Sequence, residues 1–414
     1  PVKTALAAAL ALAVVGPAAA QTAYAPRDLP TTGVSICPGG VCGAERLAPF
    51  FRGLAALEAG ASRPVHVLQI GDSHTAGDLF TGPVRSRLQG RFGRGGRGLL
   101  APGVPWVGYA PRQVQVTAQG WDWTPAPTSV GGYRSLTATG LAGGPARVAA
   151  GGTLTFTLDP EAATATVALC GREGRLAVDA DGAPLGAVEL GTGSCRTLTA
   201  TRPMRTVTLR AADGGAVLDS VWLEGPGPGL ILSNIGHVGT TLSDLAARDE
   251  AVVAAEVSAR PPDLIVLAYG TNEGFDDGLD LIVYERLLRA QIDRLRRLAP
   301  GAAILILGAP DALRRGETGA CPGAPERGPP PGLARVRDLQ RRVAAETGVA
   351  FWDWHGRMGG DCSAERLALG EDPLMRGDRV HFTAAGGEWL GAILADDLTG
   401  AYDAWRAVTS GGAD

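Results

Sequence analysis

Apolar runs alternate regularly with helical segments over residues 230–405. Strand-like runs that are apolar almost throughout are typical of parallel strands covered by helices on both faces. The predicted strands are LILSNIG (230–236), DLIVLAYG (263–270), AAILILGA (302–309) and VAFWDW (349–354). An earlier run, VHVLQI (65–70), is followed by a helical pattern starting near Pro83, so we assign it to the same sheet.

The pattern changes between these two parts of the chain. From GRGGRG at about residue 94 to GPGPG at 225–229, short runs with a period of two alternate with turn residues, which predicts an antiparallel β-sandwich. The runs are TLTFTL (153–158), TATVALC (164–170), RLAVDA (175–180), RTVTLRA (205–211) and AVLDSVWLE (216–224). We therefore predict one α/β domain made of residues 44–93 and 230–405, interrupted by a β-domain at 94–229.

The first twenty residues have the layout of a cleavable secretory signal peptide. A cationic Lys3 precedes an apolar run from Ala5 to Val15, then Pro17 and small residues. A buried first helix is the alternative. No later stretch reaches the roughly 18 apolar residues that a membrane-spanning helix needs. We expect a periplasmic or secreted protein with no transmembrane segment in the mature chain.

Cysteine usage agrees with export. The six cysteines fall into three neighbouring pairs, which favours disulfides, although six cysteines allow 15 connectivities. The neighbouring pairs are Cys37 with Cys42, Cys170 with Cys195, and Cys321 with Cys362. A zinc site is the rival interpretation, but closely spaced cysteine pairs of the usual kind are missing and the five histidines are dispersed. We expect neither a metal nor a cofactor.

Charge and composition exclude several functional classes. The net charge is -4 and the arginines are scattered, so nucleic-acid binding is not expected. Lys3 is the only lysine, so a chain processed after residue 20 has neither a Schiff-base lysine nor a P-loop lysine.

The chemistry-bearing residues stand where predicted strands end. In open parallel sheets, binding sites lie beyond the carboxyl ends of the strands. Those ends read Gly-Asp-Ser-His (71–74), Ser-Asn-Ile-Gly-His-Val-Gly-Thr (233–240) and Gly-Thr-Asn-Glu (270–273), and Gly-Asp-Arg-Val-His-Phe-Thr (377–383) comes before the last helix. In this order they resemble the four sequence blocks of the SGNH (GDSL-type) esterase and lipase superfamily. The only two asparagines of the chain, Asn234 and Asn272, both stand in these blocks.

The resemblance implies a flavodoxin-like three-layer α/β fold and a catalytic triad. Ser73 would be the nucleophile, His381 the base and Asp378 the carboxylate that orients it, as acyl transfer by serine requires. The oxyanion donors would be the backbone N–H groups of Ser73 and Gly239 and the side-chain amide of Asn272. Gly236 competes with Gly239 for this role, and His237 and His355 are the alternatives to His381. We interpret His74 and Glu273 as residues of the site wall, and Trp352 and Trp354 as residues of the core or rim.

The position of the β-domain narrows the substrate class. A secreted SGNH esterase with a sandwich between its first two blocks resembles the peptidoglycan O-acetylesterases, whose insert is similar to a carbohydrate-binding module. This implies hydrolysis of 6-O-acetyl esters on N-acetylmuramoyl residues, with O-acetylated polysaccharide as the partner. Three alternatives stay open: an esterase of acetylxylan or an exopolysaccharide, an O-acyltransferase, and an inert polysaccharide-binding protein. An inert scaffold has no need of the Ser-Asp-His set. The sequence predicts neither the ligand of the insert nor the oligomeric state.

Overall fold

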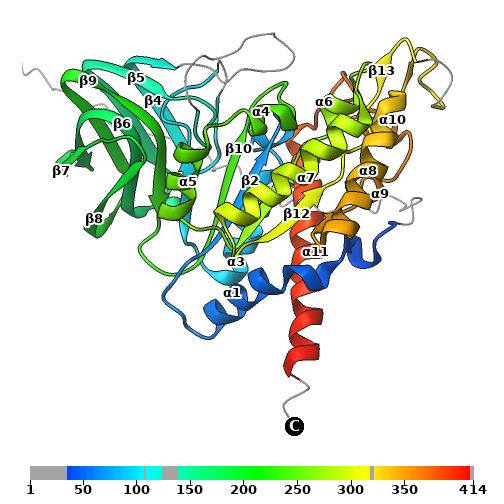
Figure 1. Ribbon diagram of the computed structural model, residues 1–414, viewed down its shortest axis with the longest axis horizontal. Coiled ribbons are helices and arrows are strands. Elements are labelled where there is room, and N and C mark those ends of the chain that lie inside the picture. The colour runs from blue at the N-terminus through cyan, green and yellow to red at the C-terminus, as the bar shows by residue number, and fades with distance from the viewer. Residues whose placement is uncertain (1–34, 107–108, 124–138, 318–320, 411–414) are drawn as a thin grey trace, which may run out of the picture.

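A six-stranded mixed sheet forms the centre of the α/β part of the chain (Figure 1). The computed structural model describes residues 35–106, 109–123, 139–317 and 321–410, so the predicted signal peptide lies outside the described residues. The strand order is β1 (Val41–Cys42), β15 (Ala350–Trp352), β12 (Ala303–Leu307), β11 (Leu264–Ala268), β2 (Val65–Gly71) and β10 (Leu230–Gly236). All neighbours are parallel except β1, which pairs antiparallel with β15. This confirms the predicted α/β fold and brings β2 beside β10 and β11.

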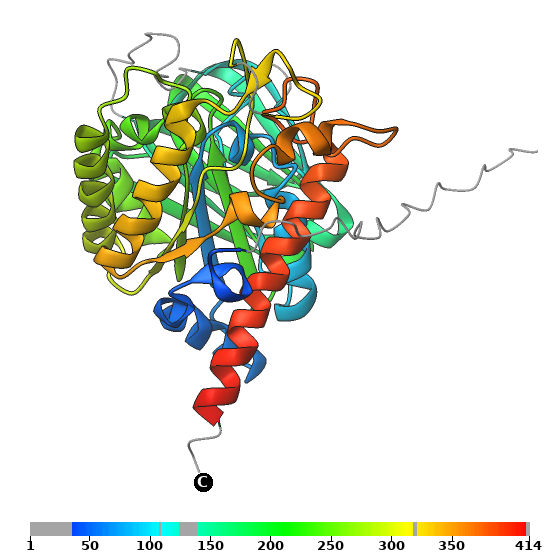
Figure 2. The same ribbon diagram turned by 90° about the vertical axis from the view of Figure 1, so that its right-hand side faces the viewer.

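Helices cover both faces of this sheet because its strands are apolar on both faces. In β2, Val65 and Val67 pack into one core, while Leu68 and Ile70 pack into the other. The first core is covered by α1 (Ala48–Glu58), α3 (Thr81–Phe92) and α11 (Ala384–Ser410). The second is covered by α4 (Leu242–Ala246), α5 (Glu250–Ala259), α7 (Leu281–Leu298) and α8 (Pro331–Thr347). Figure 2 shows the helices on either side of the sheet, with α11 running the length of one face.

The sequence pattern predicts one helix over residues 243–258 and a last helix over residues 383–398, and the structure differs from both expectations. The segment 243–258 is not one helix, because the Asp249 side chain accepts hydrogen bonds from the N–H groups of Ala251 and Val252 and so caps a new helix, α5. The last helix, α11, continues to Ser410, well past the predicted end near residue 398, because Tyr402 and Trp405 still pack against the α/β core.

The inserted part is an antiparallel sheet wrapped around its own apolar core (Figure 1, left). Its strands are β3 (Gly96–Leu100), β4 (Val114–Trp123), β5 (Ala146–Leu158), β6 (Thr164–Ala180), β7 (Ala183–Glu189), β8 (Ser194–Met204) and β9 (Thr206–Glu224). The predicted runs 164–170 and 175–180 are one strand, and so are 205–211 and 216–224. Register shifts around Gly171 and Gly174 mark bulges, which bend a strand without ending it. Both β6 and β9 therefore continue through the bulges as single long strands.

The insert is packed against the α/β part rather than tethered beside it. Leu99, Ala168 and Trp222 of the insert belong to the same apolar cluster as Leu68 and Ile70 of β2. The buried Glu256 of α5 accepts hydrogen bonds from the backbone N–H of Leu141 and the hydroxyl of Ser220. Entry and exit of the insert are also bonded to each other, because the N–H of Gly225 donates to the carbonyl of Gly95 at 2.7 Å.

Three disulfides join the neighbouring cysteines, which confirms the predicted pairs. Cys37–Cys42 lies at the edge strand β1, Cys170–Cys195 joins β6 to β8, and Cys321–Cys362 closes a loop of 41 positions. None of the helices in the described ranges is both long and apolar enough to cross a membrane.

Candidate active site

The first component of the candidate site is the turn that ends β2. The strand stops at Gly71, and Ser73 opens the short helix α2 (Ser73–Ala76). Asp72 caps this helix, since its carboxylate accepts the backbone N–H of His74 at 2.9 Å. A Cβ at position 71 would lie 2.5 Å from the carbonyl oxygen of Ala268, so only glycine lets β2 end this close to β11. The turn therefore presents Ser73 at the carboxyl end of the sheet.

The second component is the loop that precedes α11. Oγ of Ser73 lies 2.9 Å from Nε2 of His381, and Nδ1 of His381 lies 2.8 Å from Oδ2 of Asp378. The other carboxylate oxygen accepts the backbone N–H groups of Val380 and His381. Burial alone would raise the pKa of Asp378, but the backbone and side-chain hydrogen bonds from His381 outweigh it and lower the pKa. Asp378 is thus held as the charged acceptor of the His381 ring.

The loop is held in shape by a contact that sequence reasoning missed. Arg379 adopts a left-handed backbone conformation with φ of 60°, which costs free energy for a residue with a side chain. Its guanidinium makes a bidentate pair with the buried Glu365 of α10 (Ser363–Ala368), at 2.9 and 3.1 Å. While Arg379 is bound to Glu365, its neighbours contact the two histidines: Asp378 contacts His381, and Val380 contacts His74. A spacing of 14 positions carries no local sequence signal.

Two of the candidate oxyanion donors, Gly239 and Asn272, lie in the segments that follow β10 and β11. Gly239 is partly exposed and has φ of 74°, a conformation that favours glycine. Gly236 is buried, and a Cβ there would lie 2.4 Å from the backbone nitrogen of Ala76, so its glycine serves close packing against α2. Asn272, in α6 (Thr271–Gly274), donates one amide hydrogen to the carbonyl of Thr240 at 2.8 Å. This bond joins the loop after β10 to the loop after β11.

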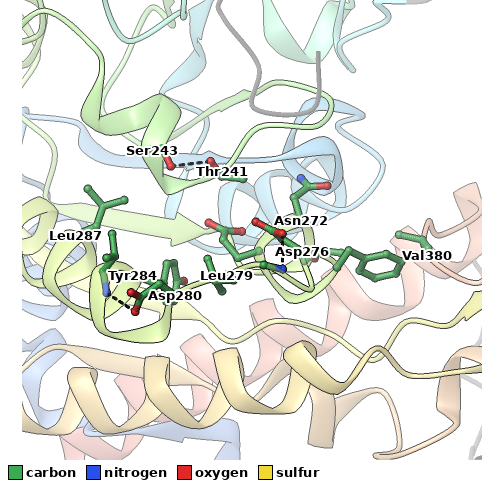
Figure 3. A pocket seen from close by; sticks show the side chains of 14 residues that line it. Thr241, Ser243, Asn272, Asp276, Leu279, Asp280, Tyr284, Leu287 and Val380 are labelled. Carbon is green, nitrogen blue, oxygen red and sulfur yellow. Dashed lines mark hydrogen bonds between the residues drawn. The ribbon is translucent and has the colours of Figure 1, made fainter. Parts of the chain in front are cut away.

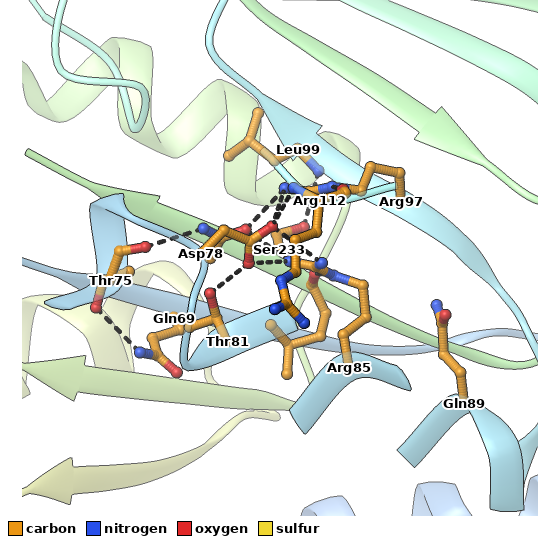
Figure 4. A network of polar contacts seen from close by, with 12 residues as sticks. Gln69, Thr75, Asp78, Thr81, Arg85, Gln89, Arg97, Leu99, Arg112 and Ser233 are labelled. Carbon is orange, nitrogen blue, oxygen red and sulfur yellow. Dashed lines mark hydrogen bonds and ion pairs between the residues drawn. The ribbon is translucent and has the colours of Figure 1, made fainter. Parts of the chain in front are cut away.

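The second asparagine has a supporting place. Oδ1 of Asn234 accepts from both Arg85 and Arg97, at 2.7 and 2.9 Å, and its amide donates to the carbonyl of Thr75. The same two arginines bind the buried Asp78, which follows α2 (Figure 4). This polar network underlies the Ser73 turn and reaches into the insert through Arg97 of β3. Sequence reasoning had not singled out its charged members.

The remaining sequence-predicted side chains lie around the site or in the core. Glu273 is buried and accepts the backbone N–H groups of Leu242 and Gly270, and burial raises its pKa to about 7. His237 is buried against the carbonyl of Ala142, with its pKa lowered to about 4 by burial. His355 pairs with Asp361 instead of a serine. Trp352 and Trp354 are buried core residues.

A pocket of about 720 Å³ opens beside Asn272 and Val380 (Figure 3). It is lined by apolar side chains of α7 and of the turn before it, among them Leu279, Val283 and Leu287, and by the polar Thr241 and Ser243. Val380 lines the pocket and directly precedes His381 in the chain, so the pocket adjoins the loop that carries the candidate base. It has room for a group much larger than an acetyl.

The arrangement is suited to nucleophilic acyl transfer. A serine hydroxyl gains reactivity when an imidazole accepts its proton and a carboxylate fixes the imidazole tautomer. In the described parts of the chain, no group of three or more His, Cys, Asp or Glu side chains is placed to hold a metal ion.

Comparisons with known proteins point to the same chemistry. Residues 216–389 match the model of the GDSL-like lipase/acylhydrolase family, a range that begins in β9 of the insert and does not include Ser73. A solved structure of a peptidoglycan O-acetylesterase is similar over 88% of this chain and 99% of its own, with 28% identity and a TM-score of 0.76. A salicylyl-acyltransferase from a tetracycline biosynthetic pathway (16% identity, 73% and 96% covered, TM-score 0.33) and a family two carbohydrate esterase from Cellvibrio japonicus (12% identity, 70% and 98% covered, TM-score 0.27) are more distant. No curated protein matches the sequence.

Proposed function

We propose that this chain, which belongs to the SGNH (GDSL-type) superfamily and is a carboxylic ester hydrolase, removes O-acetyl groups from a carbohydrate polymer. The observation that carries the proposal is the row of two hydrogen bonds from Ser73 through His381 to Asp378, at 2.9 and 2.8 Å. Three side chains in this order, at the carboxyl end of a parallel sheet, are what a serine esterase needs.

In the proposed mechanism, Ser73 Oγ attacks the acetyl carbonyl while Nε2 of His381 takes the hydroxyl proton. The carbonyl oxygen becomes an oxyanion, for which the backbone N–H groups of Ser73 and Gly239 and the amide of Asn272 are the proposed donors. Protonated His381 then gives the proton to the departing sugar hydroxyl, which leaves an acetyl-enzyme. Water activated by His381 attacks this ester, and acetate leaves as Ser73 regains its proton.

For the substrate we propose the 6-O-acetyl ester of N-acetylmuramoyl residues in peptidoglycan. Support comes from the 28% identical peptidoglycan O-acetylesterase, which this chain resembles over nearly the full length of both proteins. The pocket of about 720 Å³ beside Asn272 and Val380 far exceeds the volume of an acetyl group, so in this proposal it receives part of the glycan.

The proposed domain organisation and location follow from the same assignment. We propose residues 1–20 as a signal peptide, 44–93 with 230–405 as the hydrolase domain, and 94–229 as a carbohydrate-binding-module-like insert. The three disulfides suit an oxidising compartment outside the cytoplasm, so we propose the periplasm as the site of action.

Acetate release tests the proposal. Purified protein is incubated with O-acetylated peptidoglycan and, separately, with acetylated xylan, and free acetate is measured over time. We expect faster release from peptidoglycan, loss of release in Ser73→Ala, and unchanged release in the matched variant Ser194→Ala, whose hydroxyl lies in the insert. No acetate from either polymer would overturn the esterase assignment. Faster release from xylan would overturn the peptidoglycan assignment, and transfer of acetyl to an added sugar in preference to water would indicate an acyltransferase.

A further inference from the structure

The residue after the proposed nucleophile, His74, is held by an acceptor on each side. Its side chain is 3% exposed. Nδ1 lies 3.2 Å from Oδ1 of Asp72, and Nε2 lies 3.0 Å from the carbonyl oxygen of Val380. A neutral imidazole has only one N–H, so one of its nitrogens would point a lone pair at an oxygen. Both contacts are hydrogen bonds only when both ring nitrogens carry a proton.

The surroundings of the ring favour this charged form. Burial alone would lower the pKa of His74, but the Asp72 carboxylate, the carbonyl of Val380 and the more distant Asp378 raise it above its ordinary value. The other ionisable neighbour is His381, whose ring centre lies 5.5 Å away. The remaining ring contacts, with Trp354 and Phe382, bring no ionisable group.

The two acceptors of His74 belong to the two segments that carry the proposed triad. Asp72 precedes Ser73, and Val380 precedes His381, 308 positions after Ser73. We propose that His74 is a positioning residue, whose imidazolium form ties the nucleophile turn to the loop of the base and so fixes the distance between Ser73 and His381. This inference rests on the proposed function, and it adds a role for a side chain that touches no substrate.

The charged form of His74 predicts a particular pH dependence of activity. As the pH rises through the raised pKa of His74, the ring loses the proton on Nε2 and keeps the bond to Asp72. The Nε2 lone pair then faces the Val380 carbonyl at 3.0 Å, and the repulsion displaces Val380 together with His381. Activity should therefore fall at the high pH at which His74 is neutralised. In Asp72→Asn the carboxylate is gone, so we expect this fall to begin at a lower pH.

Kinetics with a small activated ester, p-nitrophenyl acetate, test the role independently of the natural glycan. In His74→Phe, which keeps a ring but has no N–H, we expect kcat to drop by about 100-fold with KM nearly unchanged, the loss typical of a misplaced catalytic group. The matched control is His355→Gln, which disrupts the His355–Asp361 pair away from Ser73 and should leave kcat unchanged. A kcat of His74→Phe equal to that of the control would overturn the proposal, and so would an alkaline limb that Asp72→Asn does not move.

Magnetic resonance of the ring nitrogens gives a second test, which needs no activity and no change at position 74. Ser73→Ala protein labelled with ¹⁵N-histidine contains five rings. We expect His74 to carry protons on both nitrogens at about pH 6.5, the ordinary midpoint of histidine. A singly protonated ring at that pH would overturn the proposal even if His74→Phe failed to fold. If the wild type cleaves no ester but His74 is doubly protonated, the proposed function fails while the charged bridge stands.

Discussion

Replacing Asp78 by Asn should destabilise the protein far more than removing a surface carboxylate. Asp78 is fully buried and accepts hydrogen bonds from Arg85 at 2.9 Å, from Arg97 at 3.2 Å, and from the backbone N–H of Arg112 at 2.8 Å (Figure 4). Burial alone would raise the pKa of Asp78, but the adjacent Arg85 and Arg97 guanidinium groups lower it, so the carboxylate is charged at neutral pH. The amide of Asn would leave two buried cations without an anion.

The expected loss follows from this geometry. Removing one partner of a buried ion pair costs about 3–5 kcal/mol, because the remaining charge stays desolvated. That is a large part of the roughly 5–15 kcal/mol by which a typical domain is stable. The matched control is Asp403→Asn, whose carboxylate is 57% exposed and pairs with Arg91 at the surface. An exposed pair contributes about 0–1 kcal/mol.

Urea unfolding, followed by tryptophan fluorescence, measures both variants. We expect the free energy of unfolding to fall by about 3–5 kcal/mol in Asp78→Asn and by less than about 1 kcal/mol in Asp403→Asn at pH 7. Because the folded-state pKa of Asp78 is lowered, its stabilisation is present at neutral pH and is lost as the pH falls through that pKa. The free energies of unfolding of the wild type and of Asp78→Asn should therefore converge in acid. Equal losses in the two variants would refute the reasoning.

Four further changes test the site and its supports. Asp378→Asn should lower kcat about 10⁴-fold, because the amide no longer selects the His381 tautomer. Asn272→Ala should lower kcat about 10²- to 10³-fold, because one oxyanion donor is lost. The rate of p-nitrophenyl acetate hydrolysis measures both effects. Burial raises the pKa of Glu256 to about 7, so its contribution to stability is complete below about pH 4.5 and is lost as the pH rises through 7. In Glu256→Gln, the unfolding free energy measured by calorimetry should therefore depend less on pH than in the wild type. Replacing Cys321 and Cys362 by Ser should cost about 2–4 kcal/mol in urea unfolding.

Each of these has a contrary outcome. Rates of Asp378→Asn within tenfold of the wild type would remove this carboxylate from the proposed triad, and a rise in KM alone in Asn272→Ala would make the amide a binding group. If Glu256→Gln left the pH dependence of stability unchanged, groups other than Glu256 would cause that dependence. If the double serine variant had the same urea midpoint as the wild type, contacts other than the disulfide would hold the loop between positions 321 and 362.

The sheet could be predicted because its signals are local. An apolar run such as VHVLQI, followed by small residues and a helical pattern, identifies a parallel strand without knowledge of its neighbours. The strands of the insert were divided wrongly, because Gly171 and Gly174 have the composition of a turn but act as bulges inside β6. The short edge strand β1 has two residues, too few for any periodicity.

The candidate site was predictable as far as it lies at strand ends. Ser73 lies within hydrogen-bonding distance of His381, and His381 lies within hydrogen-bonding distance of Asp378. The catalytic roles of these three residues stay a prediction. Their supports could not be found in this way. Asp78 meets Arg97 across 19 positions and a change of domain, and nothing in the spacing marks the two as partners.

The placement of β2 has a consequence for the growing chain. In the sheet, β2 pairs with β10 on one side and with β11 on the other. Neither neighbour exists when β2 is made, and 230 - 71 = 159 positions separate the end of β2 from the start of β10. At about 5–20 residues per second, synthesis of that interval lasts about 8–32 seconds. During this time the strand that will present Ser73 has no partner on either edge. All strands of the inserted β-sheet are synthesised before the first partner of β2 appears.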